Sequence, residues 1–149
     1  MSIGPARERG AAGVELLPSA FLIFVIGSLM IFNAWTVVDT WMAVSTASRE
    51  GARVFVESPP DTAWPDAQAR IMDVMDDYGR GPRTITPPPP KIEGGNFARC
   101  AVVTVTVEYD MAFISLPFVG DFGSIDTIEA SHSERIDPYR SGDFEGGCA

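Results

Sequence analysis

The chain is poor in the residues that build metal and redox sites, and its basic residues are outnumbered. It has two cysteines and one histidine among 149 residues, with no Cys-x-x-Cys pair and no Cys/His cluster. A structural zinc ion needs about four such ligands, so we expect no zinc site. Lys plus Arg number 11 against 20 for Asp plus Glu, which gives a net charge of −9. We therefore expect no charge-driven grip on nucleic acid.

Catalytic signatures are missing as well. The sequence contains no Gly-x-Ser-x-Gly, no His-Glu-x-x-His and no glycine loop of the kind that cradles phosphates. The carboxylates of Asp73, Asp76 and Asp77 fit a solvated helix face. His132 is expected to face solvent or to bond locally, because a metal site needs several ligands. The sequence thus predicts neither an enzyme nor a cofactor.

One long apolar run dominates the N-terminal third. Residues 16–38 contain no charged side chain over 23 positions, and about 20 apolar residues suffice to cross a bilayer as a helix. The apolar part of a secretory signal peptide is shorter, about 7–15 residues. Asn33 inside the run either hydrogen-bonds another helix or bonds the local backbone. The pattern predicts one membrane-spanning helix, and the length leaves room for one small folded domain.

The helix is expected to continue beyond the apolar run. Apolar or small residues recur there at three- or four-residue steps, namely Trp41, Val44, Ala47 or Ser48, Ala52 and Phe55. Pro59 and Pro60 end the helix. Pro18 is tolerated if the helix begins just upstream and produces a kink if it begins earlier.

A second, short helix is predicted before residue 79. Asp61 or Thr62 can cap it, Pro65 fits its first turn and Gly79 stops it. Its apolar stripe consists of Ala67, Ile71, Val74, Met75 and Tyr78.

Strand patterns follow the second helix. The clearest covers residues 101–110, where one face carries Ala101, Val103, Val105, Val107 and Tyr109. A third strand is predicted across residues 127–136, and short extended pieces at 83–86 and 91–93 flank four consecutive prolines and predict an edge strand. The predicted class is α+β: a long N-terminal membrane-spanning helix, then a small exported head with one short helix and a roughly three-stranded antiparallel sheet.

The residues in front of the apolar run carry the strongest functional pattern. Arg7 and Arg9 favour a cytoplasmic N-terminus and an exported C-terminal part. Glu15 lies at the mouth of the helix, where a carboxylate is costly unless it is paired or stabilised by the helix dipole. A cut between Gly10 and Ala11 would make Glu15 the fifth residue of a chain that begins with a new, positively charged amine on Ala11.

Gly10, four residues, Glu15, then Pro18 and a long apolar helix resemble the processing site of type IV pilin-like proteins. Residues 47–53, Ala-Ser-Arg-Glu-Gly-Ala-Arg, resemble the segment that follows the membrane helix in TadE-like proteins of tight-adherence pilus systems. The Val-Thr-Val-Thr-Val strand at 103–107 is also similar to that family. The likeness is strongest over residues 9–57. In that block Arg49, Glu50, Gly51 and Arg53 are the family-like positions. Without the resemblance, a solvated helix extension with Arg49 and Arg53 in an exposed i, i+4 row is the favoured interpretation.

The resemblance implies a minor pilin or pseudopilin that takes part in pilus assembly. Its partners would be a prepilin peptidase, a major pilin, other minor pilins, inner-membrane platform proteins and the lipid bilayer. The implied division is a leader at 1–10, a transmembrane and extended helix at 11–57, an exported head at 58–140 and a flexible tail at 141–149. The implied location is the cytoplasmic membrane, with the N-terminus cytoplasmic before processing, or the pilus. The first alternative is an uncleaved signal-anchored protein with an extracytoplasmic binding head. The second is a pseudopilin of a secretion apparatus, which shares the processing site and differs in its partners.

Two features of the head have alternative interpretations from the sequence alone. Cys100 and Cys148 are expected to form a disulfide if the head reaches an oxidising compartment, and otherwise to remain two thiols. Residues 111–122 are expected to form an apolar loop, which either covers the core of the head or contacts another subunit or a membrane surface.

Overall fold

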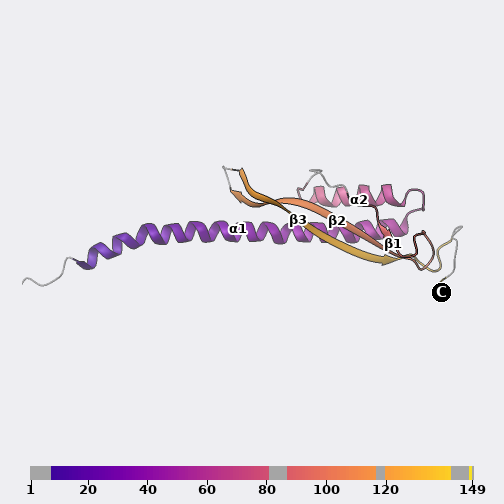
Figure 1. Ribbon diagram of the computed structural model, residues 1–149, viewed down its shortest axis with the longest axis horizontal. Helices are drawn as coiled ribbons and strands as arrows, with labels where there is room; N and C mark the ends of the chain where they lie inside the picture. Colours follow the sequence, from indigo (N-terminus) through magenta and orange to yellow (C-terminus); the bar gives the residue numbers. More distant parts are fainter. Residues whose placement is uncertain (1–7, 81–86, 117–119, 142–147, 149) are drawn as a thin grey trace, which may run out of the picture.

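The computed structural model describes residues 8–80, 87–116, 120–141 and 148, with the backbone alone for residues 8–15, 112–116 and 120–126. The elements in chain order are α1 (Glu8–Glu57), α2 (Ala63–Asp77), β1 (Lys91–Ile92), β2 (Val102–Leu116) and β3 (Gly120–Arg135). The fold is α+β, with a long N-terminal helix and a small head that holds the short helix and the three-stranded antiparallel sheet (Figure 1).

α1 is one continuous helix of 50 residues with two different halves. Large apolar side chains of its first half are exposed, including Phe21 at 70% and Phe32 at 71%. The helix is long and apolar enough to cross a membrane, which is compatible with a single-pass membrane protein. Pro18 lies inside the helix rather than at its start, and α1 bends toward its N-terminal end in Figure 1.

The second half of α1 forms the spine of the head. It contacts α2, β2 and β3, and its inward face is built from small residues together with Phe55. The predicted face is confirmed at Val44, Ala47, Ser48, Ala52 and Phe55, all of them buried. Trp41 is the exception because it is 55% exposed, and the neighbouring Thr40 takes the buried position.

α2 lies along α1 and ends in a defined cap. Thr62 occupies its N-cap without a side-chain hydrogen bond, and Pro65 lies in the first turn. The stripe of Ala67, Ile71, Val74 and Met75 is buried, whereas Tyr78, which was predicted to belong to the stripe, is 39% exposed at the C-cap. Gly79 has φ of +69°, the left-handed conformation that commonly terminates helices.

The sheet has the order β1-β2-β3, with both pairings antiparallel. Val103, Val105 and Val107 of β2 are fully buried, as the alternation predicted. The opposite face is polar, and there the Thr104 and Ser133 hydroxyls are 2.8 Å apart across the two long strands. β1 confirms the edge strand at 91–92, while the predicted strand-like piece at 83–86 lies outside the described residues.

The β2–β3 hairpin is longer than the sequence pattern predicted. Residues 111–122 were expected to form a loop, but β2 continues to Leu116 and β3 begins at Gly120. The prediction was wrong because continued pairing across the two strands satisfies backbone groups that a loop would leave to water. The register shifts near the end of the hairpin. Ala112 pairs with Ile125 and Ile114 pairs with Phe122, so between these two pairs β3 contains one residue more than β2. Such a bulge bends and twists a hairpin.

Candidate functional site at the junction of helix and head

The predicted processing residues lie far from the predicted helix block. Gly10, Ala11 and Glu15 belong to the first turns of α1, and Arg49 follows Glu15 by 34 positions on the same helix. At a rise of 1.5 Å per residue this is about 51 Å. A single copy of the chain therefore cannot bring the processing site and the helix block together, and residues 1–7 lie outside the described part.

The helix block divides into a packed side and a solvent side. Arg49 is exposed. Arg53 donates to the Glu57 carboxylate at 3.0 Å, and Glu50 lies 3.5 Å from Arg70. The hydrogen bond and charge of Glu57, with the charge of Glu50, raise the pKa of Arg53. These partly or largely exposed pairs contribute little to stability.

Gly51 is the member of the block that the fold depends on. It is buried, and a Cβ at this position would lie 2.6 Å from Cγ1 and 2.7 Å from Cδ1 of Ile71, as well as 3.5 Å from Cγ1 of Val105. Ile71 comes from α2 and Val105 from β2, so both layers of the head meet over this glycine. The absence of a side chain lets α2 approach α1 closely.

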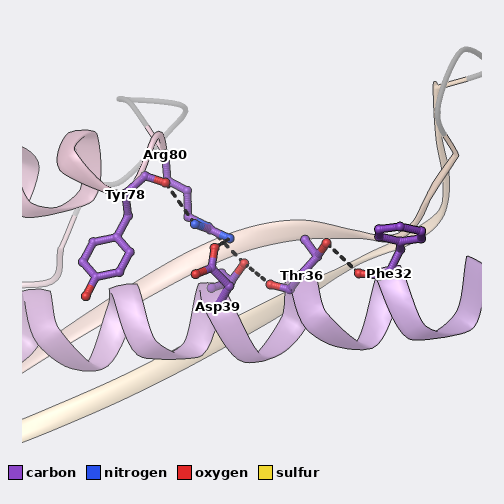
Figure 2. A network of polar contacts seen from close by, with 6 residues as sticks. Phe32, Thr36, Asp39, Tyr78 and Arg80 are labelled. Atoms are coloured by element: carbon purple, nitrogen blue, oxygen red, sulfur yellow. Dashed lines mark hydrogen bonds and ion pairs between the residues drawn. The ribbon is translucent and has the colours of Figure 1, made fainter.

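A polar network joins the two helices where the apolar run ends (Figure 2). Arg80 forms a 2.8 Å ion pair with Asp39 and donates through Nε to the Thr40 hydroxyl at 3.0 Å. Thr40 donates in turn to the Thr36 carbonyl at 2.7 Å, and Thr36 donates to the Phe32 carbonyl at 3.0 Å. The Arg80 side chain is 12% exposed, and Thr40 is buried at 1%. We call Asp39, Thr40 and Arg80 the junction clamp.

The helix cap of α2 places Arg80 in the clamp. The backbone N–H of Gly79 donates to the Asp76 carbonyl at 2.7 Å, and the backbone N–H of Arg80 donates to the Met75 carbonyl at 2.9 Å. This pair of bonds is a Schellman motif. It turns the chain so that the residue after Gly79 faces α1, and the Arg80 guanidinium also donates to the Tyr78 carbonyl at 3.1 Å.

Two exposed tryptophans lie beside the clamp on α1. Trp35 is 68% exposed and Trp41 is 55% exposed, on either side of Asp39, the first charged residue after the apolar run. Tryptophan is enriched at membrane–water interfaces, where its ring is apolar and its N–H is polar. Sequence reasoning missed this junction, although the tryptophan pair around the first charge was a readable signal. Arg80 was not readable, because only the fold brings it to α1.

At the opposite end of the head, two contacts fasten the C-terminal part of the chain. The Arg140 guanidinium donates to the carbonyls of Val56, Glu57 and Ser58 at the end of α1. It also lies 5.6 Å from the ring centroid of Phe97. These bonds satisfy carbonyls that a helix end leaves without intrahelical partners.

Cys100 and Cys148 are joined in a disulfide, with Cα atoms 5.4 Å apart. Cys100 has φ of +64° and its N–H donates to the Ile136 carbonyl at 3.1 Å, just before β2. The bridge therefore ties the C-terminal end of the chain to the start of the central strand.

The remaining polar residues singled out from the sequence have local partners or lie apart. Asn33 donates to the Leu29 carbonyl at 2.8 Å, which is the local of the two alternatives. His132 is half-buried on β3 and pairs in register with Val105. Within the described ranges, no three His, Cys, Asp or Glu side chains gather in a way that could hold a metal ion.

Comparison with known proteins adds no relative: no family model, no curated protein and no solved structure matches this chain.

Proposed function

We propose that this chain is a pilin-like subunit of the TadE kind, anchored in the cytoplasmic membrane by α1, processed between Gly10 and Ala11, and used in the assembly of a tight-adherence type IV pilus. The observation that carries the proposal is the single helix Glu8–Glu57, exposed and apolar in its first half and the spine of a small head in its second. A subunit of this shape can pack its exposed half against other helices while it displays the head outside.

Leader removal supplies the chemistry of assembly in this proposal. The peptidase replaces the amide at Ala11 with a charged amine, and Glu15 becomes the fifth residue of the processed chain. In an apolar helix bundle an unpaired carboxylate costs several kcal/mol, so the Glu15 of one subunit would be driven to pair with the new amine of its neighbour. That pairing would set the axial register between subunits. The bond between Gly10 and Ala11 belongs to the first turns of α1, where helices fray most readily, and fraying there would give a peptidase access to it.

The partners of the proposed function are the prepilin peptidase, the major pilin, other minor pilins and the inner-membrane platform. The head would face the outside of the cytoplasmic membrane, where an oxidising compartment would maintain the Cys100–Cys148 bridge.

The first test is the mass of the N-terminal peptide of the membrane-extracted protein, with and without the cognate prepilin peptidase. The proposal expects a terminus at Ala11 only when the peptidase is present. A chain that keeps residues 1–10 under both conditions contradicts it and favours the signal-anchored binding protein.

The second test replaces Glu15 with Ala. Assembly into pili should fall while membrane insertion is unchanged, because the register-setting pair is lost but the apolar run remains. Glu57→Ala is the matched control, since it removes a carboxylate from the exposed end of the same helix. Pilus levels in Glu15→Ala equal to those in Glu57→Ala would refute the assembly role.

A further inference from the structure

The β2–β3 hairpin extends past the rest of the head along α1. Figure 1 shows its end beyond the end of α2, over the part of α1 that leads toward the N-terminus. Figure 2 shows the same two strands passing the junction clamp and reaching the level of Phe32 along the helix. α1 contacts both strands.

The reach of the hairpin follows from the spacing of strand and helix. Val105 of β2 lies over Gly51, as the 3.5 Å distance to a Cβ there shows. Leu116 is 11 residues farther along the strand, up to about 36 Å at 3.3 Å per residue. From Gly51 back to Val38, the last residue of the apolar run, is only about 20 Å of helix at 1.5 Å per residue. Even a strand that crosses α1 obliquely therefore reaches past Val38, to the level of the apolar run.

The depth of that reach matches the surface layer of a bilayer. Phe32 precedes Val38 by six residues, which is about 9 Å of helix. Elements that lie in the membrane interface bury apolar groups about 5–10 Å deep. Trp35 and Trp41 are taken to mark the membrane interface. On that reference, the paired strands end at the depth where headgroups give way to acyl chains.

The sequence of the hairpin end suits that environment. Residues 111–120 contain no charged side chain, and the stretch holds Met111, Ala112, Phe113, Ile114, Leu116, Phe118 and Val119. Asp110 and Asp121 bound it on the two strands, and Asp110 accepts a hydrogen bond from Thr127 at 2.7 Å. Pairing in register up to Leu116↔Gly120 satisfies the backbone groups between the two strands. Among the described residues, the outer edge of each strand keeps unpaired backbone groups, so the contact is confined to the hydrated surface layer and stops short of the hydrocarbon core.

We propose that the end of this hairpin, residues 111–116 of β2 and 120–122 of β3, enters the surface of the bilayer beside α1 and gives the head a second membrane contact. The occupant is lipid rather than a partner protein, because the hairpin end lies at the same level along α1 as the apolar, exposed half of that helix, which needs the same environment. With no Lys or Arg between Met111 and Arg135, the contact comes from apolar burial and does not require anionic lipid. The inference rests on α1 crossing a bilayer, as the proposed function has it, and not on pilus assembly.

The test measures membrane depth with nitroxide labels on the full chain in phosphatidylcholine proteoliposomes. The labels are placed one at a time at Ser115→Cys and at Asp121→Cys, which are partners in register on the two strands. The native cysteines form a bridge and do not react. Glu108→Cys, exposed on β2 nearer the head, is the aqueous reference, and Ile31→Cys, 72% exposed on α1, is the lipid reference.

The proposal expects both hairpin labels to collide with oxygen several-fold more than with a water-soluble nickel chelate, as the Ile31 label does, while the Glu108 label shows the reverse. Hairpin labels open to the nickel chelate, with Ile31 still lipid-like, overturn the hairpin contact and leave the membrane anchor intact. Labels shielded from both reagents also overturn it, and mean that protein covers the hairpin. A water-like Ile31 label overturns the anchor itself and the inference with it. A native near-ultraviolet circular dichroism spectrum for each variant ensures that depth is read on a folded head.

Discussion

Gly51→Ala is the substitution that tests the packing of the head most directly. Alanine in place of glycine favours a helix by about 1 kcal/mol. The new Cβ would, however, meet Ile71 at 2.6 and 2.7 Å, and Ile71 is fully buried. Overpacking of this kind costs about 1–3 kcal/mol. The difference between the two terms is about 0–2 kcal/mol. Because Ile71 is fully buried and has little room to move, we expect the upper half of that range, a net destabilisation of the head of about 1–2 kcal/mol.

Thermal unfolding of the purified chain in detergent, with the disulfide intact, measures this effect. In a cooperative unit of 60–100 residues each kcal/mol shifts Tm by about 4–8 °C, so a fall of roughly 5–15 °C is expected. Gly27→Ala is the matched control, because it makes the same change in the same helix where a Cβ meets nothing within 4 Å. Its Tm should equal that of the parent protein or exceed it.

A double-mutant cycle isolates the clash from other effects of the alanine. Ile71→Ala removes both of the crowded atoms and by itself costs about 2–5 kcal/mol. In that background Gly51→Ala should be neutral or stabilising by up to about 1 kcal/mol, which corresponds to a coupling of about 1–3 kcal/mol between the two sites. If Gly51→Ala unfolds at or above the temperature of the parent protein, the close approach of α1 and α2 at this position is wrong.

Three further predictions concern the contacts that hold the head on the helix. Arg80→Met should lower the free energy of unfolding by about 1–2 kcal/mol in denaturant titration, because Asp39 loses its ion pair while Thr40 keeps its backbone acceptor; an unchanged midpoint would contradict the junction clamp. Cys148→Ser should abolish a mobility shift between reduced and non-reduced gels and cost about 4 kcal/mol, the chain-entropy value for a separation of 48 residues; identical mobility of the parent protein under both conditions would count against the bridge. Arg140→Gln should cost about 1–3 kcal/mol and speed hydrogen exchange at the end of α1, because the carbonyls there lose their donor; unaltered exchange at residues 54–58 would show that Arg140 does not hold this end.

The spacing of apolar residues along the sequence predicted most of the secondary structure. The apolar run with its three- and four-residue continuation predicted α1, and the alternating valines predicted β2, because each period assigns side chains to one face. Gly79 predicted the end of α2, because glycine has no Cβ and therefore adopts without strain the left-handed conformation that commonly ends a helix. The hairpin end was misjudged because residues 111–122 show apolar character without alternation, and only the partner strand determines that such a stretch stays extended.

The candidate site was readable in part. The processing motif and the family-like block are each a continuous stretch of sequence, so both could be identified without the structure. The roles of Gly10, Ala11 and Glu15 stay predictions. Within the block the sequence could not rank the residues. The structure separates Gly51, where two layers of the head meet, from Arg49, which faces solvent, because that distinction depends on where Ile71 and Val105 lie.

By itself the sequence determined a long helix with an apolar first half, a short amphipathic helix and alternating strands, because these follow from local periodicity and from glycine and proline stops. Tertiary structure alone decided that Arg80 reaches back 40 positions to Thr40, that Arg140 reaches Val56 across 84, and that the hairpin runs along α1 past the junction. Contacts between residues so distant in the chain depend on how the layers pack against one another, which no local pattern encodes.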